Sequence, residues 1–584
     1  MNLISKVNFV LDKKQKKQFF ILGIMIFIGG FLETVGISAL IPMITGVMAP
    51  DELLSFIERN AVLANIYDFI GITETGQLVT ILLIGIILIF IIKNLFALLI
   101  VYVQSSFISM SKAKMTSRVL REFLKRPYED YLGADIPIIF RLVGVDIPKS
   151  FTLIMAVLQL ANEVVVSLLL FVLLVIYNWQ FTLFLMVLFG GVTLFFLKFL
   201  RPVINRIGQR NHDAEAQISR WRHYTVYGLK EIKVLNREDF FVNNYYENGK
   251  IGAQTMRSYN VLHMSPRMLV ETVFIIGVFS FILLFMVGVD TGESLTTTLA
   301  IFGVVAIRML PSFMRMNTYF SDIAFNRPAF DYLHESLSET MKSDAHLVEK
   351  KDKEKSANFI LQNEIVLNNI SYAYPGTTKQ IFSDANLKIP KGKSVGIIGV
   401  SGSGKSTLVD ILLGLLQTQT GTITCDGRNI FDNYESWLSQ IGYIPQAFYL
   451  IDESIRDNVA FGIKPDEIDD ERVWEVLREA QLDDFIKELP EGLETCIGER
   501  GIRLSGGQRQ RIGIARALYH NPEILVFDEA TSALDNETEQ AVMDAINNFY
   551  GRKTMIIIAH RLNTIAKCDY VYRVVDGRLE ETTI

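Results

Sequence analysis

Long apolar runs dominate the first half of the chain. Six of them reach the length needed to cross a hydrocarbon core, about 20 helical residues, and all lie before residue 325. They predict membrane-spanning helices over Phe19–Ile44, Leu78–Phe107, Phe151–Tyr177, Trp179–Phe199, Met268–Val289 and Leu295–Phe320. This pattern excludes a wholly soluble protein.

The segment between the first two runs has a helical pattern of its own. Over residues 51–70 the apolar side chains cluster on one helical face, and most of the charged ones fall elsewhere. We expect a short amphipathic helix that either lies on the outer leaflet or packs against the other spans.

Lysine and arginine near the ends of the spans predict the orientation. The N-terminus carries Lys6, Lys13, Lys14, Lys16 and Lys17, whereas the loop after the first span has acidic residues against Arg59 alone. The two long connections, 108–150 and 200–267, are again basic. We therefore expect the N-terminus, both connections and the C-terminal half to be cytoplasmic.

The pattern changes after the last apolar run. A polar stretch, Ser343–Asn358, has almost no apolar periodicity and predicts a solvated linker. From Phe359 onward, short apolar strands alternate with amphipathic helices, which is typical of a soluble α/β domain. The predicted organisation is a transmembrane domain over 1–325, a charged linker over 326–357 and an α/β domain over 358–584.

Composition narrows the class further. Half of the 584 residues are apolar and 21% are charged, and the mean hydropathy is +0.28, so a disordered chain is excluded. The net charge of −6 gives no basic surplus of the kind that nucleic-acid binding requires, and we expect no nucleic-acid partner. Three scattered cysteines make neither a disulfide framework nor a zinc site.

A phosphate-binding motif follows a buried strand in the α/β domain. The strand Ser394–Val400 leads into a complete GxxxxGK[ST] loop and then a helix. Backbone N–H groups of such a loop surround phosphates, Lys405 reaches the β and γ oxygens, and Ser406 ligates Mg²⁺. The candidate nucleotide ligands are Gly399, Ser401, Gly402, Ser403, Gly404, Lys405, Ser406 and Thr407.

Two carboxylates end a second apolar strand, Ile524–Asp528. Asp528 is placed to hold Mg²⁺, and Glu529 to polarise the attacking water as general base. Between the two motifs lies Leu504-Ser505-Gly506-Gly507-Gln508 at the start of a helix, a second site suited to an anion. One subunit does not need two γ-phosphate sites, so this second site is expected to serve the nucleotide of a partner.

Together these motifs resemble the ATP-binding cassette (ABC) family over the whole chain, in the family's order and spacing. The resemblance implies ATP and Mg²⁺ as cofactors, with Ser406, Gln446 and Asp528 at the metal. It also implies that Tyr374 stacks on adenine, that Gln446 senses the γ-phosphate and that His560 is the switch histidine. Ser532–Asp535 then corresponds to the loop across the dimer seam, and Ser505, Gly506, Gly507 and Gln508 to the signature that completes a partner's site.

Six spans before one cassette, with Gly498-Glu499-Arg500-Gly501 before the signature, resemble exporter half-transporters. Such proteins form homodimers with two composite ATP sites. Within exporters, Phe31–Ile37, Tyr227–Lys233 and the external amphipathic segment are similar to the PglK-type bacterial flippase of lipid-linked oligosaccharides. This implies an ATP-driven flippase in the bacterial inner membrane; the alternatives are a drug, lipid or peptide exporter of the same fold, or a channel-forming ATPase.

Charged residues inside the apolar runs suggest a substrate path. Lys93, Arg267 and Arg308 lie in different spans, and an ionisable side chain at membrane depth usually faces a cavity or a charged partner. A cavity lined by these cations suits a pyrophosphate or another anionic headgroup. The alternative is internal pairing with Glu33, Glu163 or Glu271.

Overall fold

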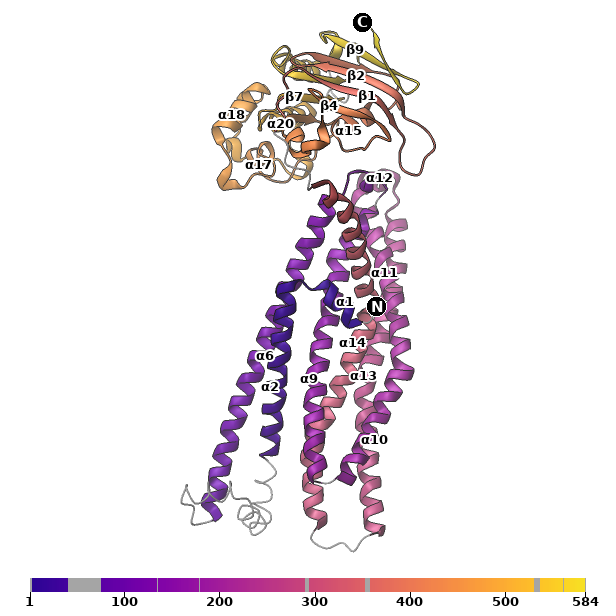
Figure 1. Cartoon of the computed structure of the whole chain (residues 1–584), viewed down its shortest axis with the longest axis vertical. Helices are drawn as coiled ribbons and strands as arrows, with labels where there is room; N and C mark the ends of the chain where they lie inside the picture. Colours follow the sequence, from indigo (N-terminus) through magenta and orange to yellow (C-terminus); the bar gives the residue numbers. More distant parts are fainter. Residues whose placement is uncertain are drawn as a thin grey trace. The chain divides into compact units, whose positions relative to one another are not determined.

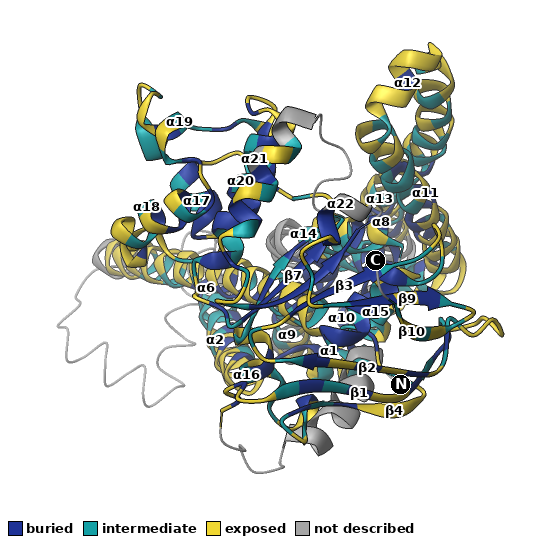
Figure 2. Cartoon of the chain, turned by 90° about the horizontal axis from the view of Figure 1, so that it is seen from above, coloured by how far each residue is buried: buried dark blue, intermediate teal, exposed yellow. Residues whose placement is uncertain are grey.

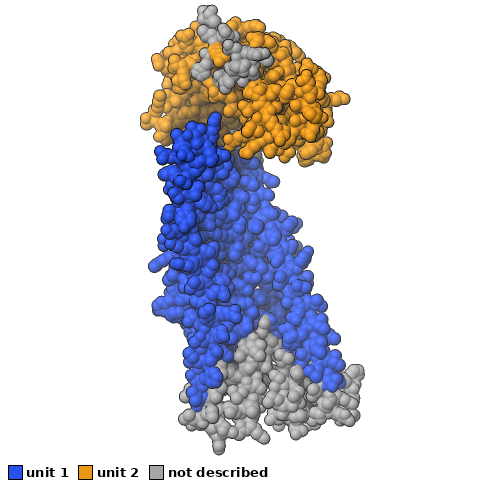
Figure 3. Space-filling model, turned by 180° about the vertical axis from the view of Figure 1, so that it is seen from behind, with its two compact units in different colours: residues 1–125, 135–345 blue, residues 126–134, 346–584 orange. Residues whose placement is uncertain are grey.

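The computed structural model describes residues 3–39, 75–133, 135–177, 179–288, 294–351, 358–529, 536–559 and 561–582. The external segment 51–70 lies outside these ranges. The chain divides into two compact units, one of residues 1–125 and 135–345 and the other of residues 126–134 and 346–584 (Figure 3).

The first unit is helical. Long helices lie side by side in it (Figure 1), joined by short helical segments and by two π-helical turns. Its elements are α1 (Leu3–Val10), α2 (Lys13–Ser38), α6 (Thr75–Lys125), α8 (Ile136–Arg141), η1 (Leu142–Asp146), α9 (Ile147–Tyr177), α10 (Trp179–Phe195), η2 (Phe196–Leu200), α11 (Arg201–Tyr227), α12 (Leu229–Leu235), α13 (Glu238–Gly288) and α14 (Ser294–Lys351).

Four candidate membrane spans are present among the described residues: Lys13–Gly36, Leu83–Lys125, Ile136–Val172 and Thr182–Tyr227. They contain most of the first four predicted spans. In α6, Ile84, Leu88, Leu95 and Leu98 are each more than half exposed, as expected of a helix whose outer surface faces hydrocarbon. The last two predicted spans run partly over residues whose side chains are not described, so the count of six stays a prediction.

Helix α14 extends well beyond the last predicted span. Phe330, Leu333 and Leu337 are buried in one core with residues of α1, α2, α6 and α9. The first unit accordingly reaches residue 345, and the segment expected to be a linker is helical as far as Lys351.

The second unit is built on two sheets. A four-stranded antiparallel sheet has the order β2-β1-β4-β5, and a six-stranded sheet has the order β10-β9-β3-β8-β7-β6, with β9, β3, β8, β7 and β6 parallel. The strands are β1 (Glu364–Tyr372), β2 (Phe382–Pro390), β3 (Ser394–Ile398), β4 (Thr420–Cys425), β5 (Arg428–Asn429), β6 (Ile441–Ile444), β7 (Ile524–Asp528), β8 (Thr554–Ile558), β9 (Tyr570–Val575) and β10 (Arg578–Thr582).

The second unit also contains helices. They are α7 (Glu129–Leu132), α15 (Lys405–Leu412), α16 (Tyr434–Ser439), α17 (Ile455–Val459), α18 (Asp470–Glu479), α19 (Asp483–Lys487), α20 (Gly506–Leu518), α21 (Asn536–Asn547) and α22 (Leu562–Ile565). Short 3₁₀ turns complete the unit: η3 (Ile430–Asn433), η4 (Pro465–Glu467), η5 (Gly492–Glu494) and η6 (Glu499–Gly501).

Two cores lie on opposite faces of the parallel strands. Along β7, Ile524 and Val526 belong to the core shared with the antiparallel sheet, whereas Leu525 and Phe527 belong to the core shared with α17, α18 and α20. Figure 2 shows β3 and β7 as buried strands. Burial on both faces explains why these strands are continuous apolar runs in the sequence.

Helices α11 and α14 approach closely at Gly208. A Cβ added there would lie 2.3 Å from the carbonyl oxygen of Phe325, well inside van der Waals contact. Only glycine therefore allows this separation of the two helices.

We predict that Gly208→Ala destabilises the first unit, because the added methyl pushes the two backbones apart. Overpacking of this kind costs about 1–3 kcal/mol. Thermal unfolding of the purified protein in detergent measures the effect. Gly249→Ala in α13, where nothing lies within 4 Å of an added Cβ, is the matched control and should not destabilise. Equal stability of the two variants would contradict a tight α11–α14 contact.

Candidate active site

The candidate nucleotide residues gather at the carboxyl edge of the parallel sheet. The phosphate loop follows β3, Asp528 ends β7, and Gln446 comes two residues after β6. Open α/β sheets bind ligands at this edge. His560 comes two residues after β8, but it lies outside the described residues, as do Ser532–Asp535.

The phosphate loop forms a turn that ends in the N-terminus of α15. Gly399, Ser401, Gly402, Ser403 and Gly404 make the turn, and Lys405, Ser406 and Thr407 make the first turn of the helix. Gly404 has φ +103°, a left-handed conformation that favours glycine.

Polar groups of this loop are arranged for an anion. The Lys405 ammonium donates to the carbonyl oxygens of Gly399 and Val400 at 3.1 and 3.2 Å, so it is already folded over the loop. The Ser403 hydroxyl is buried and has no hydrogen-bond partner in the described part of the chain. An unpaired buried hydroxyl beside an ammonium and a helix N-terminus fits a phosphate group.

The acidic side of the site supplies oxygen atoms for a hard cation. The Ser406 hydroxyl donates to Oδ1 of Asp528 at 3.4 Å. Burial, reinforced by the neighbouring Glu529, raises the pKa of Asp528. A serine hydroxyl and a buried carboxylate are ligands that Mg²⁺ accepts, and a bound cation would favour the ionised form of Asp528.

Glu529 is held in an unusual conformation. Its φ is +49°, its backbone N–H donates to the carbonyl oxygen of Ile558, and its Oε2 accepts a hydrogen bond of 3.0 Å from Nε2 of Gln446. Non-glycine residues in this region of φ are strained, and such strain concentrates at functional sites. The structure thus brings together two of the predicted catalytic residues.

Two residues near Asp528 were not anticipated from the sequence. Tyr443 on β6 hydrogen-bonds with Asp528. Asp410 lies on α15, and its burial together with the negative charge of Asp528 raises its pKa to about 6. A lone acid in an otherwise apolar stretch of helix was the available signal for Asp410. Both residues belong to the surroundings of the metal-binding carboxylate.

Tyr374, expected to stack on adenine, contacts the phosphate-loop helix. Its phenol oxygen is 2.8 Å from the hydroxyl oxygen of Thr407, and its ring packs edge-on against Tyr372. A nucleotide that binds to the Thr407 hydroxyl has to displace the Tyr374 hydroxyl from it.

A short helix from the connection 108–150 belongs to the same compact unit as the cassette. Helix α7 belongs to the second compact unit, and its Glu129 carboxylate accepts a hydrogen bond of 2.8 Å from the backbone N–H of Gln417. The sequence did not predict this association.

The signature residues begin α20. Ser505 is the N-cap, and its hydroxyl accepts from the backbone N–H of Gln508 while the Gln508 side chain accepts from the backbone N–H of Ser505. Gly506 and Gly507 are the first residues of the helix. Among the described residues, Ser505 hydrogen-bonds within the N-terminus of α20 and not with the phosphate loop.

The proposed substrate-path cations differ in their surroundings. Lys93 is half-buried, with its ammonium 4.1 Å from the ring centroid of Phe90. Arg267 is exposed, and the side chain of Arg308 is outside the described part. Arg315, by contrast, pairs with Glu163 through two bonds of 2.7 and 3.1 Å, so internal pairing applies to this arginine.

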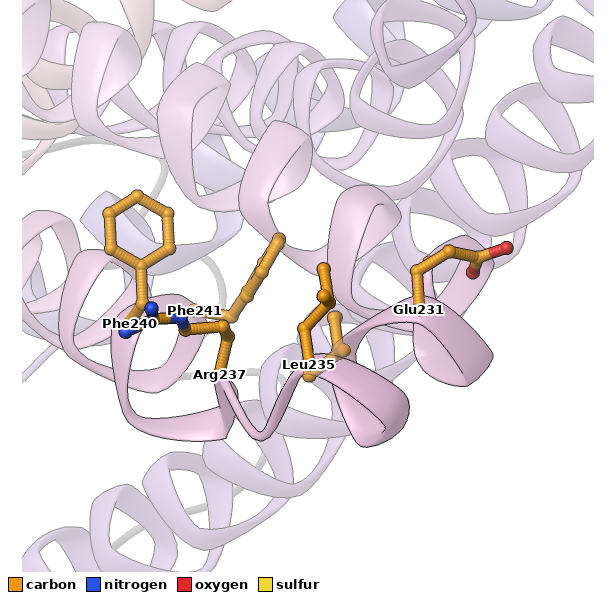
Figure 4. A pocket seen from close by; sticks show the side chains of 7 residues that line it. Glu231, Leu235, Arg237, Phe240 and Phe241 are labelled. Atoms are coloured by element: carbon orange, nitrogen blue, oxygen red, sulfur yellow. The ribbon is translucent and has the colours of Figure 1, made fainter.

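An apolar pocket lies at the turn between α11 and α13. Its volume is about 420 Å³, and Figure 4 shows Leu235 and the two phenylalanines beside it. It is lined by Gly228, Glu231, Ile232, Leu235, Arg237, Phe240 and Phe241. Val234 is 77% exposed on the adjoining helix α12, so this end of the first unit presents apolar surface.

Comparisons with known proteins agree with this geometry. Residues 382–532 match the profile of a family described as ABC transporter. Over 413 residues the chain is 31% identical to the ATP-dependent lipid A-core flippase of Desulfotalea psychrophila, a match that covers 69% of each chain. It is also 42% identical over 224 residues to ABC transporter B family member 15 of Arabidopsis thaliana, covering 38% of this chain and only 18% of that protein.

A solved structure shares the fold. The structure of a bacterial Atm1-family ABC exporter with ATP bound superposes with a TM-score of 0.77 over 97% of this chain and 95% of that one, at 20% sequence identity. The predicted fold class, an exporter-type membrane domain followed by an ABC cassette, is confirmed.

We predict that Tyr374→Phe binds MgATP at least as tightly as the parent. The change removes the hydrogen bond to Thr407, worth about 1 kcal/mol or up to about fivefold in affinity, and keeps the ring available for stacking. Nucleotide titration of the full chain measures it. Tyr372→Phe is the matched control, because the buried Tyr372 hydroxyl has no partner in the described chain to lose. Weaker binding by Tyr374→Phe alone would mean that the hydroxyl assists the nucleotide.

Proposed function

This chain belongs to the ABC transporter family, and from that premise we propose that it is an ATP-driven flippase for an amphiphilic lipid with an anionic headgroup. The ATP-binding domain of this family uses ATP with Mg²⁺. The observation that carries the proposal is a phosphate loop with a paired Asp528 and Glu529, on the same chain as helices apolar enough to cross a membrane.

The residues of the cassette have distinct roles in the proposed hydrolysis. Lys405 and the N-terminus of α15 bind the phosphates, and Ser406 and Asp528 would hold Mg²⁺, which neutralises phosphate charge when bound. Glu529 takes the proton of the water that attacks the γ-phosphorus atom, and ADP leaves with the bridging oxygen. Gln446 and His560 contact the γ-phosphate side, and Tyr374 stacks on adenine.

The proposed active form is a homodimer. In each of two composite sites, the phosphate loop of one subunit faces Ser505 and Gly507 of the other. The apolar pocket and exposed side chains around α12 support association with a second subunit, because soluble surfaces seldom leave such patches uncovered.

The proposed substrate is a lipid-linked oligosaccharide with a pyrophosphate. Lys93, Arg267 and Arg308 would face its charge, and the flippase relatives act, by their name, on another glycolipid, lipid A-core. We place the protein in a bacterial inner membrane, with its N-terminus and cassette in the cytoplasm, as the basic connections suggest. A drug or peptide exporter of the same fold is the competing proposal.

Transport by purified protein in liposomes tests this proposal. We expect MgATP to drive translocation of a fluorescent pyrophosphate-linked oligosaccharide lipid faster than that of a neutral lipid or a cationic drug. Glu529→Gln should slow both hydrolysis and translocation by about 10²–10⁴-fold, the usual contribution of a general base. Preference for the drug would overturn the substrate class, and preference for lipid A-core would replace the oligosaccharide with that glycolipid.

A charge-removal variant tests the substrate path. Replacing Lys93, Arg267 and Arg308 together by Gln should abolish translocation of the anionic lipid and leave basal ATP hydrolysis within about twofold, because only the substrate interaction is lost. The matched control removes the same charge from exposed positions of α6, with Lys112, Lys114 and Arg121 changed to Gln. Unchanged translocation by the first variant would dismiss the anionic path.

Mixed dimers test the composite sites. A Lys405→Ala chain paired with a Ser505→Arg chain should keep one intact site and measurable ATP hydrolysis. Both mutations then fall in the same composite site, and the other site combines an unchanged phosphate loop with an unchanged signature. Hydrolysis as low as in either homodimer would mean either that the sites are not shared between subunits or that the two sites hydrolyse ATP only in concert.

A further inference from the structure

Lys93 is a charged residue in the middle of a predicted membrane span. It lies fourteen residues from the nearer end of the span Leu78–Phe107, which is roughly 21 Å along the helix axis and farther than a lysine side chain reaches. The ammonium therefore cannot extend to the membrane surface as the ammonium groups of lysines near helix ends do. It needs a partner or a polar cavity at its own depth.

The ammonium of Lys93 rests on an aromatic ring. Its Nζ lies 4.1 Å from the ring centroid of Phe90, which comes one turn earlier on α6, and the side chain is half-buried. Within the described part of the chain, Lys93 forms no hydrogen bond and no ion pair. The face of a ring attracts a cation, but it offers no oxygen atom to the three N–H donors of an ammonium. These donors therefore remain for an anion.

A glycine on α2 makes room for the lysine side chain. Helices α2 and α6 lie side by side (Figure 1), and a Cβ added at Gly36 would lie 3.1 Å from Cδ of Lys93 and 3.7 Å from its Cε. The shorter separation is tighter than ordinary van der Waals contact, so a methyl group at position 36 would have to move the lysine. Gly36 is buried inside a helix, where glycine is unfavourable, and this contact is a reason for its presence.

The contact at Gly36 repeats a packing position of the same two helices. Seven residues earlier on α2, a Cβ added at Gly29 would lie 2.5 Å from Cδ1 of Ile100, and Ile100 comes seven residues after Lys93 on α6. The helices are therefore antiparallel and meet through the same faces at both glycines, since seven residues make about two helical turns. Close packing accounts for Gly29, which meets an apolar residue, whereas Gly36 meets a cation.

We propose that Gly36 and Phe90 are positioning residues that hold Lys93 as a phosphate-binding cation of the substrate path. Gly36 fixes the aliphatic part of the lysine, and Phe90 fixes the ammonium, whose N–H groups can then make charge-assisted hydrogen bonds to phosphate oxygens. A side chain that is already ordered loses less conformational freedom when the lipid binds. The proposal rests on the proposed function, in which Lys93 meets the charge of the transported lipid.

The preference between two lipids tests this proposal in the full-length protein reconstituted in liposomes. The probes are a fluorescent pyrophosphate-linked oligosaccharide lipid and the same lipid with a neutral linkage. Gly36→Ala should lower the preference for the pyrophosphate lipid about tenfold, the usual effect of losing a hydrogen bond to a charged group. The loss should appear in the KM for that lipid more than in kcat, because lipid binding is altered. Phe90→Leu should act in the same direction, and Phe90→Tyr, which keeps the ring, should not.

Two further variants separate positioning from packing. Gly29→Ala is the matched control, since it adds the same methyl group between the same helices but beside Ile100 and not beside a cation. It should leave the lipid preference unchanged even where it lowers the thermal stability. Lys93→Gln should lower the preference by itself, and adding Gly36→Ala to it should lower the preference no further, because the glycine acts through the lysine.

The outcomes that contradict the proposal are distinct from those that contradict the proposed function. An unchanged preference in folded Gly36→Ala protein, an equal loss in Gly29→Ala, or a loss that adds in full to that of Lys93→Gln would each overturn the proposal. If Gly36→Ala does not fold, Phe90→Leu and Phe90→Tyr supply the comparison, and an equal preference in the two would overturn it. A parent protein without preference for the pyrophosphate lipid would refute the proposed function, and this proposal with it.

Discussion

Burial of the central parallel strands on both faces is the constraint on which the cassette depends. Because β3, β7 and β8 are covered by one core on each side, their polar functional groups can emerge only where the strands end. The phosphate loop, Asp528 and the position before His560 all lie at those ends. Strand order then determines which groups are neighbours, and β6 brings Gln446 to Glu529.

The first unit differs from the cassette, because apolar side chains cover much of its outer surface as well as filling its cores, and its buried ionic groups have partners. Asp146 is fully buried between Arg141 and His212, at 3.1 and 3.3 Å. The π-helical turn η1 lies between Arg141 and Asp146. A π-helical turn is wider than an α-helical turn, so it changes which side chains share a face of the helix. Arg141 and Asp146 are five residues apart, and in a regular α-helix their side chains would point in different directions. Buried charges of this kind are stable only with partners.

The sequence was sufficient for features whose chemistry is local. The phosphate loop with its strand and helix, the strand before Asp528 and the capped helix after Leu504 could all be predicted, because each depends on contiguous residues. Contacts between distant segments could not. The pairing of Tyr374 with Thr407, the association of Glu129 with Gln417, and the contact of the Phe448 ring with Gly513 each join residues that no periodicity relates. The pairing of Arg315 with Glu163 is a further contact of this kind, because the two residues are 152 positions apart in the sequence.

The N-terminus of α20 illustrates how a site can be stable alone and still accept a ligand. The Ser505 hydroxyl accepts a hydrogen bond from the backbone N–H of Gln508, and the Gln508 side chain accepts one from the backbone N–H of Ser505. Such neutral hydrogen bonds contribute about 1 kcal/mol each. A partner's phosphate would offer charge-assisted hydrogen bonds, which are roughly twice as strong, and would also meet the positive end of the helix. The capping box therefore preserves the helix end in the absence of a partner and is weak enough to be exchanged. The same balance applies to Gln446, whose amide donates to the Glu529 carboxylate at 3.0 Å and would be free to bind a ligand that offers a stronger hydrogen bond.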